Sequence, residues 1–172
     1  MKIAVVGNAA GGKSFLSRKL GQRLSIPVTH VDSIQFLPGM KIRPHIETIK
    51  ILRAAALQEN WIIDGYGPLD IIEERFLIAD RIIFIDLPLW RHYLWAAKRQ
   101  FQNLWSQRIE LPNDCREASF SQTKKLFKTL WVLHKKMRPE LIKIFGREHL
   151  KPKMIFIRSV ADFKKVFENT LS

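Results

Sequence analysis

Cysteine is almost absent from this chain of 172 residues, which has a single one, Cys115. One cysteine excludes a disulfide framework within the chain, and such a chain suits a reducing compartment. No apolar stretch approaches the roughly 20 residues that a membrane span requires. We therefore expect no membrane partner. The first residues lead directly into a strand pattern, so we expect no signal peptide and, with the single cysteine, a cytoplasmic location.

Acidic residues are also scarce. The chain has 16 Asp and Glu residues against 29 Lys and Arg residues, which gives a formal net charge of +13. The excess is uneven, because residues 91–153 hold 15 basic residues and only 5 acidic ones. A basic surface of this kind usually meets phosphates, whether on nucleotides, nucleic acid or lipid. The alternative interpretation is a solvated basic face without a specific partner.

Apolar and amphipathic segments alternate along the chain, which predicts an α/β fold with a mainly parallel sheet. Pro139 should kink or divide the helix expected over residues 121–145 near Arg138. Two segments, 33–45 and 108–120, have the composition of loops. Strands are expected over residues 2–6, 27–32, 61–64, 81–86 and 154–158. Helices are expected over residues 14–24, 46–60, 121–145 and 160–171, and after Pro88, where Trp90, Leu94, Ala97, Phe101 and Leu104 share one side.

The segment GNAAGGKS matches the pattern G-x-x-x-x-G-K-[ST] at every fixed position. Glycines let the backbone wrap closely around a phosphate, and the following helix N-terminus adds positive potential. Lys13 is expected to reach the β- and γ-phosphates of ATP, and Ser14 to bind Mg²⁺. A glycine-rich turn that spells the motif by chance is the alternative, which the flanking strand and helix disfavour. The predicted nucleotide-binding residues are Gly7, Asn8, Ala9, Ala10, Gly11, Gly12, Lys13 and Ser14.

Two carboxylates, Asp64 and Asp86, end predicted buried strands. Parallel α/β sheets gather their ligand groups at this end of the strands. Either residue is therefore a candidate to hold Mg²⁺ or one of its waters, as an acidic partner of Ser14. The alternative for each is a carboxylate that caps the next turn or helix, and the residues alone leave the two nearly even.

Four short motifs stand out along the chain: GNAAGGKS at 7–14, HVD at 30–32, WIIDG at 61–65, and DLP at 86–88 before Trp90 and Arg91. Taken together, they resemble the adenylate-kinase-like P-loop kinases. Within that group the chain is most similar to the bacterial DNA topology modulation proteins of the FlaR type. The resemblance covers most of the chain to about residue 145.

The resemblance implies a nucleoside-monophosphate-kinase fold, a three-layer P-loop NTPase built on a five-stranded parallel sheet. Residues 1–172 would form one domain, with an acceptor-binding insert at about 33–60 and a lid at about 99–122. Asp64 aligns with the aspartate that orients Mg²⁺-bound water in nucleotide kinases, which makes it the preferred metal-linked residue. Asp32 lies where related small-molecule kinases place an acceptor-binding carboxylate, although a buried helix cap is its alternative role. Tyr66, which follows Asp64 and Gly65, is a candidate substrate-binding residue together with Asp32.

The chain departs from its relatives after Tyr66. Nucleotide kinases usually continue with Pro-Arg and use that arginine on the acceptor phosphate, whereas here the nearest arginine is Arg75. The identity of the acceptor therefore stays open. Within the insert, Arg43, Lys50 and Arg53 are candidates to hold an acceptor anion.

Arginines around the lid would stabilise the charge on the transferred phosphoryl group. Arg99 and Arg108 are the preferred candidates because they flank the predicted lid, and a solvated surface arginine is the alternative for each. His92 and His134 are expected to have core or surface roles. The five tryptophans are expected to pack in the core and between helices, and not to stack on bases.

These observations predict an enzyme, an ATP- and Mg²⁺-dependent kinase with a small-molecule acceptor such as a nucleoside monophosphate. A nucleotide-gated nucleic-acid binder is the second hypothesis, motivated by the basic segment, although no nucleic-acid-binding motif is visible. An ATPase without a separate acceptor is the third. The oligomeric state cannot be predicted from the sequence.

Overall fold

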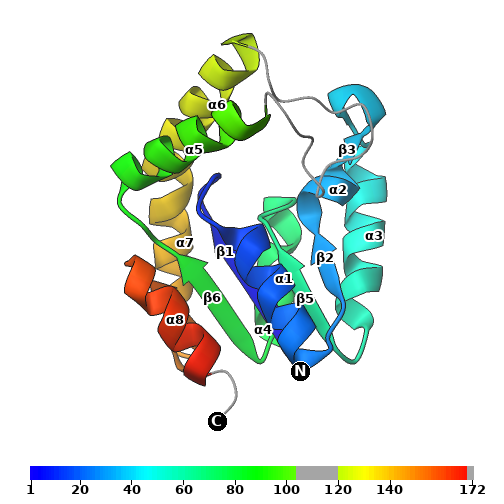
Figure 1. Cartoon of the computed structure of the whole chain (residues 1–172). Helices are drawn as coiled ribbons and strands as arrows, with labels where there is room; N and C mark the ends of the chain where they lie inside the picture. The colour runs from blue at the N-terminus through cyan, green and yellow to red at the C-terminus, as the bar shows by residue number, and fades with distance from the viewer. Residues whose placement is uncertain (104–119, 170–172) are drawn as a thin grey trace.

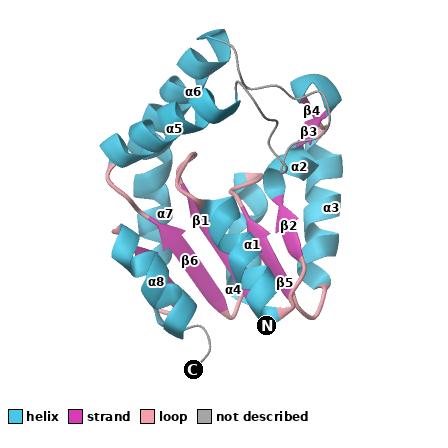
Figure 2. Ribbon diagram, viewed as in Figure 1, coloured by secondary structure: helices cyan, strands magenta, loops and turns pink. Residues whose placement is uncertain are grey.

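The computed structural model describes residues 1–103 and 120–169 and contains a five-stranded sheet with helices on both faces (Figures 1 and 2). Its strands follow the order β2-β5-β1-β6-β7, and every neighbouring pair is parallel. All five predicted strands are confirmed, and each observed end lies within two residues of the predicted one. Their bounds are Lys2–Gly7 (β1), Val28–His30 (β2), Trp61–Asp64 (β5), Arg81–Ile85 (β6) and Met154–Ile157 (β7).

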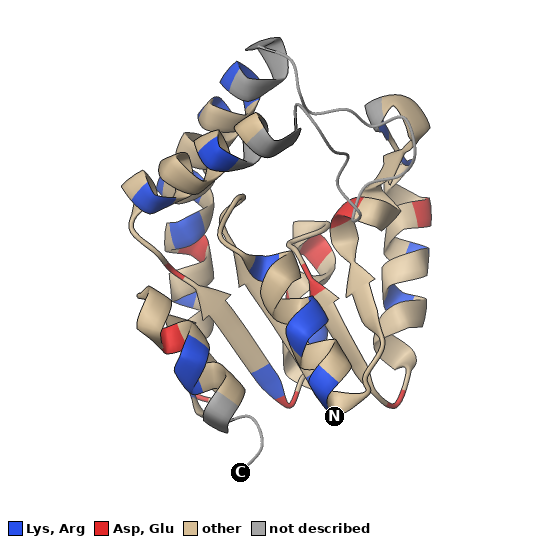
Figure 3. Cartoon of the chain, in the orientation of Figure 1, with Lys and Arg blue, Asp and Glu red and all other residues tan. Residues whose placement is uncertain are grey.

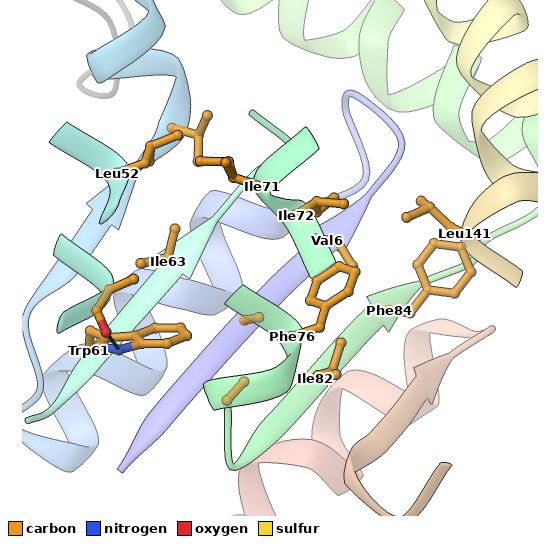
Figure 4. Close-up of a cluster of buried hydrophobic side chains, with 14 of the residues drawn as sticks. Val6, Leu52, Trp61, Ile63, Ile71, Ile72, Phe76, Ile82, Phe84 and Leu141 are labelled. Atoms are coloured by element: carbon orange, nitrogen blue, oxygen red, sulfur yellow. Dashed lines mark hydrogen bonds between the residues drawn. The ribbon is translucent and has the colours of Figure 1, made fainter. Parts of the chain in front are cut away.

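Alternate residues of the strands fill two separate cores, one on each face of the sheet. Helices α1 (Lys13–Leu24) and α8 (Val160–Asn169) cover one core. Helices α3 (His45–Leu57), α4 (Ile72–Ile78) and α7 (Arg138–Phe145) cover the other, which Figure 4 shows. Side chains such as Trp61, Phe76 and Phe84 are almost completely buried there, and each stabilises the fold by about 1.5–3 kcal/mol. The result is the expected three-layer arrangement.

The segment after β2 is more regular than its composition indicates. It forms helix α2 (Val31–Gln35) and a small antiparallel hairpin of β3 (Phe36–Leu37) and β4 (Lys41–Ile42). The prediction of a loop over 33–45 is therefore wrong. The 3₁₀ turn Leu69–Ile71 and helix α4 were also not predicted. These elements are two to seven residues long, too short to show a clear hydrophobic period.

Helix α5 (Leu89–Asn103) packs against α6 (Phe120–Val132), with the rings of Tyr93 and Phe127 5.3 Å apart. A π-helical turn, Leu133–Met137, joins α6 to α7. Pro139 lacks a backbone N–H and cannot continue a regular helix, so the predicted division near Arg138 is confirmed. The loop predicted at 108–120 and most of the predicted lid lie outside the described residues.

The expectation that tryptophans pack in the core holds for Trp61 and is wrong for two others. Trp90 on α5 and Trp131 on α6 are largely exposed. Among the described side chains of α5, the buried ones are instead His92 and Ala96, and His92 contacts the loop after β1. In the part of the chain that the structure describes, no helix is both long and apolar enough to cross a membrane.

Candidate functional site

The GNAAGGKS motif forms the loop between β1 and α1. Gly7 ends β1 with φ 150°, and a Cβ atom there would lie 2.6 Å from the carbonyl oxygen of Ile85 on β6. Only glycine lets the chain leave the sheet at this point. Gly12, with φ 83°, is the N-cap of α1, which begins at Lys13. The loop therefore leads the chain into a helix whose N-terminal N–H groups have no partner within the helix.

Two contacts within the loop set its curvature. The Lys13 ammonium donates to the carbonyl oxygen of Asn8 over 3.0 Å, across the full width of the loop. The backbone N–H of Ala9 donates to the Asn8 side-chain oxygen over 2.8 Å. Ala10 has a left-handed backbone, with φ 50°. The motif is thus a closed turn, with its lysine lying over the loop.

Helices α5 and α6 support this loop from outside. The Asn8 amide donates to the carbonyl oxygen of Leu130 over 2.9 Å. His92 is 1% exposed, and its Nδ1 lies 3.0 Å from the carbonyl oxygen of Ala9, so Nδ1 is the donor. Burial lowers the pKa of His92, and the nearby Lys13 charge acts in the same direction. A neutral imidazole therefore holds the loop at this point.

Asp64 lies beside the loop at the end of β5, the strand next to β1. It is 3% exposed, and its Oδ2 lies 2.9 Å from Nδ1 of His30. The two residues are direct partners in the pairing of β2 with β5, and Asp64 also pairs with Val5 of β1. The sheet therefore places an imidazole and a carboxylate at the same edge as the P-loop.

Arg75 of α4 holds the turn that follows Asp64. Its Nη2 donates to the carbonyl oxygens of Gly65 and Tyr66, over 2.7 and 3.1 Å. Burial lowers the pKa of Arg75 to about 10, while the negative charge of Asp64 opposes this shift. The arginine is therefore a buried support of the turn and a counter-charge for Asp64.

Asp86 at the end of β6 has a different partner. Arg138 of α7 donates to both of its oxygens, with Nε to Oδ1 at 2.6 Å and Nη2 to Oδ2 at 2.9 Å. This bidentate contact raises the pKa of Arg138. Asp86 thus anchors α7 to the sheet.

Tyr66 lies in the turn after β5. Burial, with a contribution from the Asp86 charge, raises the pKa of Tyr66, so its hydroxyl stays protonated at neutral pH.

Most of the predicted acceptor residues follow β2, the strand on the side of β5 that faces away from β1. Asp32 is half-buried in the first turn of α2, two residues beyond His30. Arg43 donates through Nε to the carbonyl oxygen of Ile34 over 2.7 Å and so fastens the β3–β4 hairpin to α2. Arg53 forms a surface ion pair with Glu74, and Lys50 is exposed. Arg43 therefore connects the hairpin to α2, and this contact does not depend on an acceptor.

The structure brings together the P-loop, Asp64, Tyr66 and Asp32 at one edge of the sheet. Arg99 lies on α5, and Arg108 lies outside the described residues. Sequence reasoning missed the contacts of His30, Arg75 and Arg138. The HVD motif and the interruption at Pro139 were visible, but no spacing signal links these residues to their partners.

Comparison with known proteins gives a likeness in structure only. Models of known protein families do not match the sequence, and neither do curated proteins. An uncharacterized protein from Eubacterium ventriosum has a TM-score of 0.55 and 15% identity, covering 99% of this chain and 96% of its own. A shikimate kinase from Bacteroides thetaiotaomicron has a TM-score of 0.57 and 12% identity, covering 100% and 99%. At such identities the likeness shows the fold alone, and the predicted P-loop fold with a five-stranded parallel sheet is confirmed.

Proposed function

We propose that this chain is an ATP-dependent phosphotransferase that moves the γ-phosphoryl group of ATP to a small acceptor. The observation that carries the proposal is the motif GNAAGGKS in a closed loop between β1 and α1, with Lys13 lying over it. The structural likeness to a protein named shikimate kinase supports a kinase. We also propose that the chain is related to the DNA topology modulation proteins. We propose that it acts in the cytoplasm, where ATP is present and cysteines are reduced.

The residues present fit ATP with Mg²⁺. At Gly7 and Gly11 a Cβ atom would lie within 3 Å of Ile85 and His92, so these glycines let the loop pack closely against β6 and α5. The N-terminus of α1 adds positive potential. Lys13 would bind the β- and γ-phosphates. Ser14 and Asp64 offer the oxygen ligands that Mg²⁺ prefers, directly or through water. When bound, Mg²⁺ neutralises the charge of the phosphate oxygens.

Asp64 is a better candidate for this role than Asp86. Both oxygens of Asp86 accept bonds from the guanidinium of Arg138, which already compensates its charge. Among the described residues, Asp64 instead meets a side chain through Oδ2 alone, which accepts a hydrogen bond from Nδ1 of His30. Both β5 and β6 pair with β1, so the distinction between the two carboxylates rests on these side-chain partners.

The acceptor would lie between the end of β5 and helix α2, near Asp32, Tyr66 and Arg43. An acceptor that is already a phosphate anion needs no base, whereas an alcohol acceptor would make Asp32 the candidate base. Arg99 and Arg108 remain the predicted sources of positive charge for the transferred group.

The test is ADP release from ATP and Mg²⁺ in a coupled assay, with nucleoside monophosphates, nucleosides and small hydroxy acids as acceptors. One acceptor class should stimulate turnover. Lys13→Ala should lower that turnover by about a hundredfold or more, because the positive charge that would bind the β- and γ-phosphates is lost. Lys19→Ala, an exposed lysine on the same helix, is the matched control and should not change it.

Other outcomes would change the conclusion. Hydrolysis that no acceptor stimulates, but that still requires Lys13, would make the protein an ATPase. Equal turnover in the wild type and Lys13→Ala would mean that this loop is not the site. Absent turnover with intact ATP binding would favour a nucleotide-controlled switch.

A further inference from the structure

Helix α5 turns an apolar stripe toward solvent. Trp90, Leu94 and Phe101 are 58%, 59% and 71% exposed. Their spacing of four and seven residues places them on one side of the helix, and exposed Ala97 lies on the same side. His92 and Ala96, on the opposite side, are buried toward the P-loop. The stripe therefore faces away from the nucleotide site.

Helix α6 extends this stripe. The contact between Tyr93 and Phe127 joins the two helices, and Trp131 lies one turn beyond Phe127. Trp131 is 50% exposed, and exposed Lys124 and Lys128 share its side of the helix at spacings of four and three residues. We name the outer surface formed by Trp90, Leu94, Phe101, Trp131, Lys124 and Lys128 the outer face.

The charge around the outer face has one sign. Residues 89–103 and 120–138 together hold nine Lys and Arg residues and no Asp or Glu. Figure 3 shows blue segments and no red ones along α5 and α6. Besides Lys124 and Lys128, the exposed lysines are Lys98, Lys125, Lys135 and Lys136. An occupant of this face must therefore accept positive charge and also cover apolar side chains.

This combination distinguishes between occupants. A second copy of the chain would bring two positive faces together, which costs energy through like-charge repulsion. Nucleic acid would accept the lysines and could stack on tryptophan, but it offers nothing to Leu94. The surface of an anionic bilayer accepts both, because tryptophan, leucine and phenylalanine enter the headgroup boundary while lysines meet the lipid phosphates.

We propose that the outer face docks on the surface of an anionic phospholipid membrane. The expectation of no membrane partner rested on the lack of a spanning segment, and surface docking requires none. In this arrangement α5 and α6 lie along the bilayer, and the P-loop lies on their other side. The proposal is independent of the phosphotransferase activity, since none of the six side chains that define the face belongs to the candidate site.

The test is co-sedimentation with vesicles of phosphatidylcholine alone and with 30% phosphatidylserine, at low and physiological salt. The wild type should bind only the anionic vesicles, and more weakly as salt rises. Trp90→Ser with Phe101→Ser should weaken binding at least tenfold. Lys124→Gln with Lys128→Gln should weaken it about tenfold, because each lysine contributes to the attraction. Ile46→Ser with Leu57→Ser, two side chains that are each 81% exposed on α3, is the matched control and should bind like the wild type.

Circular dichroism should be unchanged in all three double variants, and none of them should unfold at a lower temperature than the wild type, because every substituted side chain is exposed. Failure to bind anionic vesicles at low salt would overturn the proposal. Binding that the outer-face variants keep, or that the α3 variant loses, would also overturn it. The outer-face variants are also tested for dimer formation by sedimentation and for binding to duplex DNA. If the substitutions abolish either of these and leave vesicle binding intact, the proposal is wrong.

Discussion

Single side chains beneath the P-loop fix it through hydrogen bonds to and from the backbone. Asn8 donates to Leu130 and accepts from Ala9, and His92 donates to the Ala9 carbonyl. A carbonyl oxygen can only accept, so His92 keeps its proton on Nδ1. The loop conformation therefore depends on two buried polar side chains from outside the motif's fixed positions.

Acid should destabilise the protein through these histidines. Burial lowers the pKa of His92, and also that of His134, below the ordinary value of 6.5. As the pH falls through 6.5, the unfolded chain therefore takes up protons before the folded one does. The free energy of unfolding should be highest above pH 6.5 and should decrease below it.

Urea unfolding at pH 7.5 and pH 5.5 measures this loss. His92→Asn keeps a donor near the Ala9 carbonyl but has no titrating group, so its loss of stability with acid should be smaller than that of the wild type. An equal loss in both proteins would show that His92 does not contribute.

The two strand-end carboxylates should differ in their effect on Mg²⁺. Asp64→Asn should raise the Mg²⁺ concentration needed for half-maximal binding of an ATP analogue by about tenfold or more. Asp86→Asn should leave that concentration unchanged, since its carboxylate faces Arg138. Calorimetric titration at several Mg²⁺ concentrations checks both variants without requiring turnover. A larger effect of Asp86→Asn would reverse the assignment.

Short elements hold the turns at the edge of the sheet. Helix α4 has only seven residues, yet it places Arg75 beneath the carbonyls of Gly65 and Tyr66. The hairpin β3–β4 is fastened to α2 by Arg43 in the same way. In both cases one arginine connects a brief element to backbone that lies beside the candidate site.

Removing the guanidinium of Arg75 should be costly. Arg75→Met keeps much of the volume but leaves two buried carbonyls without a donor and Asp64 without its nearby positive charge. We expect the free energy of unfolding to fall by about 2–4 kcal/mol in urea titration.

Arg53→Met is the control for Arg75→Met. Its ion pair with Glu74 is exposed, so we expect a loss below about 1 kcal/mol. Similar losses in the two variants would contradict a specific supporting role for Arg75.

The elements that the sequence predicted well are those with long or repeated signals. Apolar runs predicted the five strands, and a fixed motif predicted the P-loop. The apolar stripe of α5 was visible as well, but periodicity does not say which face meets the core. Here small Ala96 and polar His92 are buried, because the helix approaches the P-loop closely on that side.

The partners of the site residues could not be predicted. His30 and Asp64 are 34 positions apart, Asp86 and Arg138 are 52, His92 and Ala9 are 83, and Asn8 and Leu130 are 122. Such contacts exist only after the sheet and its helices have assembled, so no local spacing reveals them. The roles of single motifs were therefore predictable, and the connections between them were not.

Over the whole molecule, positive charge is concentrated in residues 91–153, which hold 15 basic and 5 acidic residues. The net charge of +13 and the sequence pI of about 10.2 imply self-repulsion in the folded state at neutral pH. Exposed lysines lie on α5, on α6 and in the π-helical turn that follows: Lys98, Lys124, Lys125, Lys128, Lys135 and Lys136. Repulsion between them opposes the packing of α5 against α6.

Salt should therefore stabilise the protein. Raising NaCl from 20 to 300 mM should increase Tm by about 2–4 °C, the equivalent of roughly 1 kcal/mol, because screening weakens the repulsion. Scanning calorimetry in chloride avoids sulfate and phosphate, which would bind the P-loop. The increase should be smaller in a variant with Lys124→Gln and Lys125→Gln. A Tm that falls with salt would show that attractive ion pairs dominate.

The strand order also determines when the sheet can form during translation. β1 lies at the centre, yet its neighbours β5 and β6 begin about 60 and 80 residues later in the chain. At about 5–20 residues per second, the ribosome needs several seconds to deliver them. During that interval the apolar segment of β1 has no sheet partner, and neither half of the sheet can close around it. The strand that leads into the P-loop is thus the one that waits longest for a sheet neighbour while the polypeptide is still emerging.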